Sequence, residues 1–154
     1  MAGGVTNPAL LIGIGHSFRR DDGIGPAVAE AVQALGLAGL DILTHHGEGT
    51  DLMARWQGYA TVVVVDATAS GAGPGHIQHW NAVAAALPAS LFPKGSHVFG
   101  LAEGIEMARL LGQLPPTLMV VGIEGADFSA GLDLSPPVAA ALADAVAVVL
   151  GLVG

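Results

Sequence analysis

The chain has 154 residues, of which 52% are apolar and 12% charged, and its formal net charge at pH 7 is −8. This length predicts a single domain over residues 1–154, and the acidic charge argues against nucleic-acid binding. The chain has no cysteine, which excludes disulfides, thiolate nucleophiles and thiolate metal ligands. It also lacks the uninterrupted apolar run of about 18 residues that a membrane span needs, and its first residues lack the basic region of a signal peptide. We therefore expect a cytoplasmic protein without membrane insertion, with a monomer favoured.

The first half of the chain contains three predicted strands and one helix. Residues 9–15 form a continuous apolar run that ends in glycine, and 61–67 form the clearest strand of the chain. Such runs are typical of parallel strands that are covered on both faces. Residues 40–46 are a shorter strand candidate, expected near an edge of the sheet. The predicted helix has one apolar face, made by Ile24, Val28, Val32 and Leu35.

The second half continues the alternation of strands and helices. A short strand is expected at 76–80, and 117–124 is a further apolar run. The helix between them has an apolar stripe of Leu101, Ile105, Ala108 and Leu111. Ser135 and Pro136 read as the N-cap and first position of a final helix. The pattern predicts an α/β fold, a three-layer α/β/α sandwich around a mostly parallel sheet of about five strands.

Polar side chains follow several of these strands. Asp22 lies in the loop after the first strand, Asp66 closes the valine run and Glu124 closes the last strand. His97 precedes the helix that starts near Leu101. In open parallel sheets, ligands bind beyond the carboxyl ends of the strands. The two aspartates and the histidine offer oxygen and nitrogen donors that suit a divalent ion such as Zn, Ni, Mn or Fe.

Each of these residues also has a structural interpretation. Asp22 can stabilise the start of the following helix, Asp66 can cap a turn, and His97 can cap a helix or be merely exposed. A functional role is favoured over a structural one for Asp66. Its carboxylate directly follows four valines of a buried strand, and burying it there without a partner would be costly. Glu124 is expected to be structural.

The remaining charged and histidine residues near the strand ends are expected to be structural. At least one of Arg19 and Arg20 is expected to pair with Asp21 or with solvent. His45 and His46 are adjacent on a predicted strand, where side chains alternate between faces. They are therefore not expected to share one ligand.

Known enzyme motifs are mostly absent from the sequence, and two alternative functions stay open. The "GIGHSF" turn begins like a dinucleotide-binding loop, but Phe18 stands where a third glycine is needed, and Asp41 is weak support as the distal acidic residue. The sequence contains no P-loop, no H-E-x-x-H helix and no G-x-S-x-G elbow. A small-ligand or nucleotide-binding domain without proteolytic activity and a self-contained metallohydrolase both remain possible interpretations.

The opening loop resembles a family signature. Residues 13–25, "GIGHSFRRDDGIG", are similar to the G-x-G-N-x-x-x-x-D-[DE]-G-x-G opening of the endopeptidases that mature nickel-iron hydrogenases. The resemblance continues through 47–68, 96–116 and 120–138, so it covers nearly the whole chain in order. The chain departs from the signature at His16, where the family commonly has Asn. This departure puts the shape of the loop in question and makes His16 a minor candidate for an extra ligand.

The resemblance implies an activity and a set of site residues. Members of the family remove a short C-terminal extension from the precursor of the hydrogenase large subunit after nickel insertion. The implied metal is thus nickel that the substrate delivers, not a permanently bound cofactor. The family's metal-contacting positions fall on Asp22, Asp66 and His97, and the two aspartates are the expected catalytic residues. Asp21 is expected to shape the loop, and the expected substrate-binding loop residues are Gly23, Gly25, His16 and Arg19.

Overall fold

The computed structural model of the protein describes residues 8–88, 90–93 and 97–154. Gly95 and Ser96, which belong to the predicted turn before His97, lie outside the described residues, as do residues 1–7. In chain order, the elements are β1 (Ala9–Ile14), the short 3-10 helix η1 (Arg20–Gly23), α1 (Ile24–Gln33), β2 (Leu40–His45), α2 (Gly49–Trp56), β3 (Thr61–Thr68), β4 (Ile77–Asn81), α3 (Leu101–Leu111), β5 (Thr117–Glu124) and α4 (Pro136–Val153).

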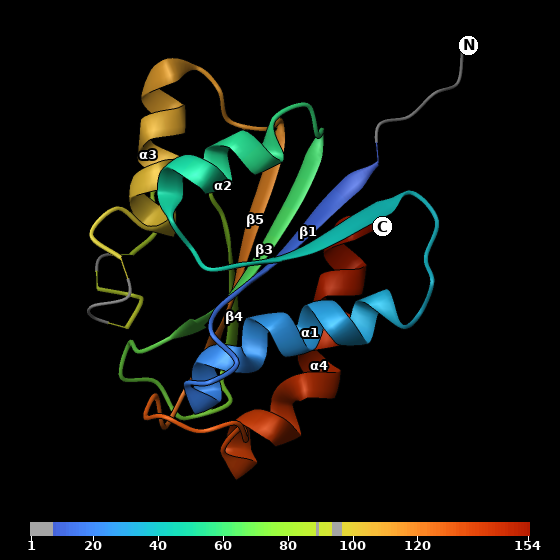
Figure 1. Ribbon diagram of the computed structural model, residues 1–154. Coiled ribbons are helices and arrows are strands. Elements are labelled where there is room, and N and C mark those ends of the chain that lie inside the picture. The colour runs from blue at the N-terminus through green and yellow to red at the C-terminus, as the bar shows by residue number, and fades with distance from the viewer. Residues whose placement is uncertain (1–7, 89, 94–96) are drawn as a thin grey trace.

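The strands form a five-stranded sheet in the order β2-β1-β3-β5-β4 (Figure 1). Neighbouring strands pair in parallel, except that β4 pairs antiparallel with β5. The predicted mostly parallel sheet is confirmed, with the two short strands β2 and β4 at its edges. Because β1, β2, β3 and β5 run in the same direction, their carboxyl ends meet at one edge of the sheet.

Helices cover both faces of the sheet, with α1 and α4 on one side and α2 and α3 on the other (Figure 1). Side chains alternate along each strand. Val62 and Val64 pack in the core under α2 and α3, whereas Val63 and Val65 pack in the core under α1 and α4. Asp66 follows the alternation of Val62 and Val64, so its carboxylate emerges on the α2 and α3 side.

Helix α2 has no counterpart among the predicted helices. It is only eight residues long, and its buried face consists of Leu52, Met53 and Trp56 besides the initial glycine. Its first turn is stabilised by Glu48, whose side-chain oxygens accept hydrogen bonds from the backbone N–H groups of Thr50 and Asp51 at 3.0 and 2.9 Å. One short apolar face and a glutamate cap are weak signals, which is why periodicity did not predict this helix.

Helix α4 starts at Pro136 as predicted, but Ser135 does not cap it through its side chain. The Ser135 hydroxyl instead donates a hydrogen bond to Asp21 at 2.7 Å. Within the described residues, α4 is the one helix long and apolar enough to cross a membrane by length and composition. Here it packs on the sheet through Val138, Ala141, Ala145 and Val149.

Two glycines allow the start of α1 to touch the ends of the central strands. A methyl group on Gly25 would overlap the carbonyl oxygen of Ile14 and crowd that of Val65. A methyl group on Gly15, whose φ is +145°, would overlap the carbonyl oxygen of Asp22. Both glycines therefore serve the contact between β1, η1 and α1, which sets how closely the η1 carboxylates approach β3.

We predict that Gly25→Ala lowers the free energy of unfolding by about 3 kcal/mol or more, because the added methyl group must displace backbone atoms. Urea unfolding followed by circular dichroism measures this change. The matched control is Gly151→Ala in α4, where nothing lies within 4 Å of the added methyl group. That control should stabilise the protein by up to about 1 kcal/mol through helix propensity. Equal stabilities of Gly25→Ala and the wild type would contradict the packing argument.

Candidate active site

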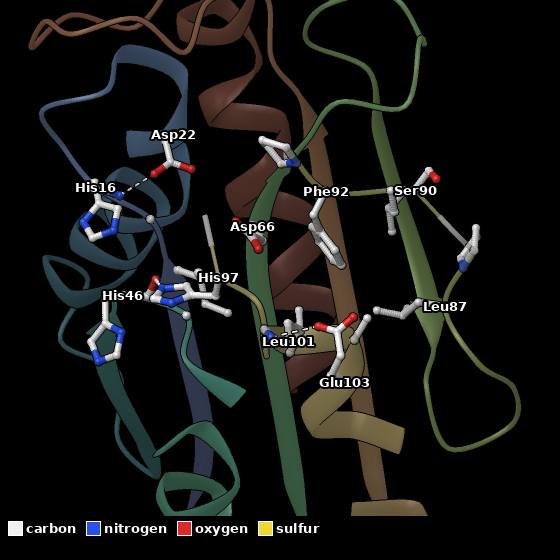
Figure 2. Close-up of a pocket in the computed structure, with 18 residues that line it drawn as sticks. His16, Asp22, His46, Asp66, Leu87, Ser90, Phe92, His97, Leu101 and Glu103 are labelled. Atoms are coloured by element: carbon white, nitrogen blue, oxygen red, sulfur yellow. Dashed lines mark hydrogen bonds between the residues drawn. The ribbon is translucent and has the colours of Figure 1, made fainter. Parts of the chain in front are cut away.

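A cavity of about 390 Å³ opens at the carboxyl edge of the sheet, on the side of α2 and α3. Its polar lining comes from five separate segments of the chain, namely His16 and Asp22 after β1, His46 after β2, Asp66 in β3, Ser90 after β4, and His97 with Glu103 around the start of α3. Leu87, Leu91, Phe92 and Leu101 give it apolar walls. In Figure 2, Asp22 and His97 lie on the same side of Asp66, toward His16 and His46. The structure thus brings the three predicted metal-contacting residues to one cavity.

Asp21 holds the loop that carries Asp22. Its buried carboxylate accepts hydrogen bonds from the backbone N–H groups of Ala126, Asp127 and Ser135 at 2.7, 2.9 and 2.7 Å, and from the Ser135 hydroxyl. Burial alone would raise the pKa of Asp21, but the hydrogen bonds from Ser135, Ala126 and Asp127 outweigh it, so the pKa is lowered. Asp21 is therefore a structural anion that ties η1 to the loop between β5 and α4, and it shapes the loop as predicted.

Asp22 closes the turn after β1. One oxygen of its buried carboxylate accepts a hydrogen bond from the backbone N–H of His16 at 2.8 Å. The backbone of residue 16 makes this contact, so the turn forms although His16 replaces the Asn that is common in the family signature. The His16 side chain is exposed and lines the cavity (Figure 2).

Asp66 is the electrostatically strained member of the site. Burial raises its pKa well above the usual range, and the nearby charge of Asp22 raises it further. The backbone N–H of Ala67 offsets this increase only in part. A carboxyl group in this situation can take up a proton or bind a cation, and both properties are those of a functional carboxylate.

His97 is held by the turn after β2. Its Nε2 lies 2.8 Å from the carbonyl oxygen of His46, and because a carbonyl can only accept, Nε2 carries the hydrogen. In the neutral ring, Nδ1 then has a free lone pair. His97 can therefore act as a nitrogen ligand through Nδ1.

His45 and His46 do not point to opposite faces, contrary to the expectation from strand alternation. The strand ends at His45, and the two rings stack with centroids 4.4 Å apart, while His46 is tilted against His97 at 5.4 Å. Among the described residues, the group whose possible metal-ligand atoms all lie within 4.8 Å of one another is His45, His46 and Asp51. Asp22, Asp66 and His97 line one cavity with wider spacing.

Glu124 is structural, as expected. Its buried carboxylate accepts hydrogen bonds from the Thr68 and Ser70 hydroxyls, both at 2.7 Å, and from the backbone N–H groups of Ser70 and Gly71. Burial raises the pKa of Glu124, but these hydrogen bonds outweigh that effect, so its pKa is lowered. The glutamate holds the loop between β3 and β4.

The predicted substrate-binding loop divides into residues that line the cavity and residues that do not. His16 lines it, whereas Gly23, Gly25 and Arg19 are absent from its lining. Gly23 and Gly25 are buried, and the contacts around Gly25 are internal ones with β1 and β3. Arg20 does not pair with Asp21, because its Nε lies 3.7 Å from Asp127 instead.

Comparisons with known proteins agree with this geometry. A sequence model of the family described as "hydrogenase maturation protease" (HycI) matches residues 26–152. The chain belongs to this family. The maturation protease is thus a peptidase, and the predicted family is confirmed by a match that begins at residue 26, directly after the opening loop.

Solved structures with similar folds carry related descriptions. The hydrogenase maturating endopeptidase HybD from E. coli is 22% identical with a TM-score of 0.77, and the match covers 94% of this chain and 90% of that one. HybD from Thermococcus kodakarensis is 21% identical with a TM-score of 0.76, covering 96% and 99%. A hydrogenase 2 maturation peptidase from a Thaumarchaeota archaeon is 25% identical with a TM-score of 0.69, covering 96% and 98%. The comparison with curated proteins found no match.

Sequence reasoning missed two parts of the protease site, the apolar wall of Leu87, Leu91 and Phe92 and the turn between β2 and α2. This turn supplies His46 and Gly47 to the cavity and the carbonyl oxygen that holds His97. The adjacent His45 and His46 were the available signal. Their importance was hidden because the end of β2 and the presence of α2 were not predicted.

We predict that Asp21→Ala lowers the free energy of unfolding by about 2–4 kcal/mol, because it leaves the partly buried N–H groups of Ala126, Asp127 and Ser135 without their acceptor. The low pKa of Asp21 means that its contribution is present above the unfolded-state pKa and lost as the pH falls through the folded-state pKa. The difference between variant and wild type, measured by urea unfolding, should therefore shrink in acid. Asp133→Ala, at an exposed position of the same loop, is the control. An Asp21→Ala protein as stable as this control would refute the anchoring role.

We predict that Asp66→Asn stabilises the protease by about 0.5–2 kcal/mol at neutral pH, because it removes a buried charge that repels Asp22. The raised pKa of Asp66 means that its protonated form favours folding, so its stabilising contribution is present below the unfolded-state pKa. That contribution is lost as the pH rises through the folded-state pKa. The stability gained through Asp66→Asn should thus be larger at neutral pH than at acidic pH, as measured by thermal unfolding. Asp144→Asn on the exposed face of α4 should change stability little at either pH.

Proposed function

We propose that this protease removes the C-terminal extension of a nickel-iron hydrogenase large-subunit precursor after nickel has been inserted. The observation that carries the proposal is the convergence of Asp22, Asp66 and His97 on one cavity in a member of the hydrogenase maturation protease family. Their donor set of two carboxylate oxygens and one imidazole nitrogen fits a borderline divalent ion such as nickel. The partner is the precursor itself, and we expect the protein to act as a cytoplasmic monomer.

The proposed substrate brings its own nickel to this cavity. The metal of the precursor docks against Asp22, Asp66 and His97 and marks the large subunit as ready for cleavage. Asp66 gains most from such docking, because a cation relieves both its burial cost and the repulsion by Asp22. The apolar walls from Leu87, Leu91, Phe92 and Leu101 supply a surface for side chains of the extension.

Two chemical roles are open to the same residues. In one, the substrate's nickel acts as a Lewis acid that polarises the scissile carbonyl or activates a water molecule. In the other, Asp66 or Asp22 acts as general base: it takes a proton from the attacking water, and the proton passes to the leaving amine as the C–N bond breaks. The raised pKa of Asp66 favours that residue as the proton-accepting group.

A nucleotide-binding function is disfavoured by the same geometry. A phosphate would have to sit at the turn after β1, where Asp22 presents a buried carboxylate. Asp41, the distal acidic residue of the dinucleotide interpretation, accepts a hydrogen bond from the Tyr59 hydroxyl at 2.6 Å. A self-contained metallohydrolase is distinguished by metal analysis, because it would retain stoichiometric metal through dialysis.

We predict that the wild-type protein shortens a nickel-loaded cognate precursor by a C-terminal peptide and leaves the nickel-free precursor intact, as read by mass spectrometry. Asp22→Ala, Asp66→Asn and His97→Gln should each lower kcat/KM by about 100-fold or more. Asp144→Asn should cleave like the wild type. Cleavage of both precursors would keep the peptidase and remove nickel as the signal. Unchanged cleavage by the Asp22→Ala variant would refute both chemical roles.

A further inference from the structure

A second cluster of polar side chains lies beside the cavity, at the end of β2. His45 is buried there, with Nε2 2.6 Å from Asp51 Oδ2 and Nδ1 2.8 Å from the backbone nitrogen of Gly47. Because Gly47 N–H donates to Nδ1, the ring hydrogen of neutral His45 is on Nε2 and is donated to Asp51. Burial lowers the pKa of His45, which favours its neutral form, and the hydrogen bond to Asp51 opposes this effect only in part. Both nitrogens of this ring are therefore engaged, each in a fixed role.

These hydrogen bonds argue against a metal site formed by His45, His46 and Asp51, although their ligand atoms lie within 4.8 Å of one another. An imidazole that binds a metal through one nitrogen carries its hydrogen on the other. For His45 to bind through Nε2, its Nδ1 would need that hydrogen, which would then face the N–H of Gly47. Asp51 and His45 are therefore better explained as residues that support the backbone than as metal ligands.

The backbone that this pair supports is the turn after β2, which holds His97 through a hydrogen bond. His46 accepts the Nε2–H of His97 through its carbonyl oxygen at 2.8 Å, and Gly49 N–H donates to the carbonyl of Phe99 at 2.8 Å. At Gly47, φ is +104°, and a side chain there would contact the His97 ring. The turn after β2 is thus in contact with the segment 97–100 along its length, and Figure 2 shows His46 and His97 on the same side of the cavity.

We propose that Asp51 and His45 are positioning residues for His97. They hold the turn in the shape that presents the His46 carbonyl to Nε2–H of His97, which selects the tautomer with its lone pair on Nδ1. This inference rests on the proposed function for the meaning of that lone pair, which becomes the nitrogen offered to the substrate's nickel. Asp51 and His45 touch neither substrate nor metal in this arrangement.

The tautomer of His97 can be read directly from ¹⁵N chemical shifts and ring proton–nitrogen couplings in the full-length, histidine-labelled protein at one fixed neutral pH. The wild type should show His45 and His97 as Nε2–H tautomers. His45→Phe, which keeps a flat ring but removes both nitrogens, should give His97 a mixture of tautomers. Its kcat on the nickel-loaded precursor should fall about 10- to 100-fold, with a smaller change in KM. His79→Phe, the same replacement on exposed β4, is the control and should match the wild type.

Two variants of Asp51 keep the test decisive if His45→Phe unfolds. Asp51→Asn retains an oxygen that accepts from His45 and should keep the His97 tautomer, whereas Asp51→Ala removes that acceptor and should lose it. A single unchanged His97 tautomer in Asp51→Ala and in folded His45→Phe would overturn the proposal. Zn²⁺ added to the His97→Gln protein provides a second check, since a shift of the His45 ring nitrogens would show a metal ligand instead of a support. The spectra are recorded without substrate and do not depend on activity. A wild-type protein that fails to cleave the precursor would therefore contradict the proposed function, but not the positioning role of Asp51 and His45.

Discussion

The site depends on one buried anion, Asp21, and on the hydrogen bonds that converge on it. Its carboxylate connects η1 with the backbone of Ala126 and Asp127 and with Ser135 before α4. Because those donors satisfy the charge, Asp21 can be buried at low cost beside a second carboxylate. The neighbouring Asp22 is then presented to the cavity by a loop that is held from both ends. Without this anchor, two adjacent aspartates after a buried strand would only repel each other.

The carboxyl edge of the sheet carries two kinds of buried carboxylate. Asp21 and Glu124 are surrounded by N–H and O–H donors, and their pKa values are lowered. Asp66 has a raised pKa and Asp22 as an unfavourable neighbour. The fold thus satisfies the anions that hold its loops and leaves another under-satisfied at the cavity. That contrast separates structural carboxylates from functional ones on electrostatic grounds, and the under-satisfied group is the one that a cation or proton would stabilise.

Much of this fold follows from local pattern, and the parts that do not have identifiable causes. The strand at 117–124 and the helix Leu101–Leu111 match their predicted bounds, because long apolar runs and periodic stripes specify buried elements strongly. Parallel strands also predict that Asp22 and Asp66 meet at one edge. The stacked His45 and His46 could not be predicted, since their arrangement depends on where β2 ends. The different roles of Asp21 and Asp22 depend on which loop packs over η1. That packing joins residues far apart in the sequence, and Asp21 and Ser135 are 114 positions apart.

These long-range contacts have a consequence for a chain that is being synthesised. His97 is held by the carbonyl of His46, 51 residues earlier in the chain. Asp21 is held by Ser135, 114 residues later and directly before α4. Neither contact can form until most of the polypeptide has left the ribosome, because contacts of such sequence separation require the intervening chain to be in place. A truncated or nascent form therefore has the carboxylates of a protease without their arrangement. The arrangement of the site thus requires residues as far along the chain as Ser135.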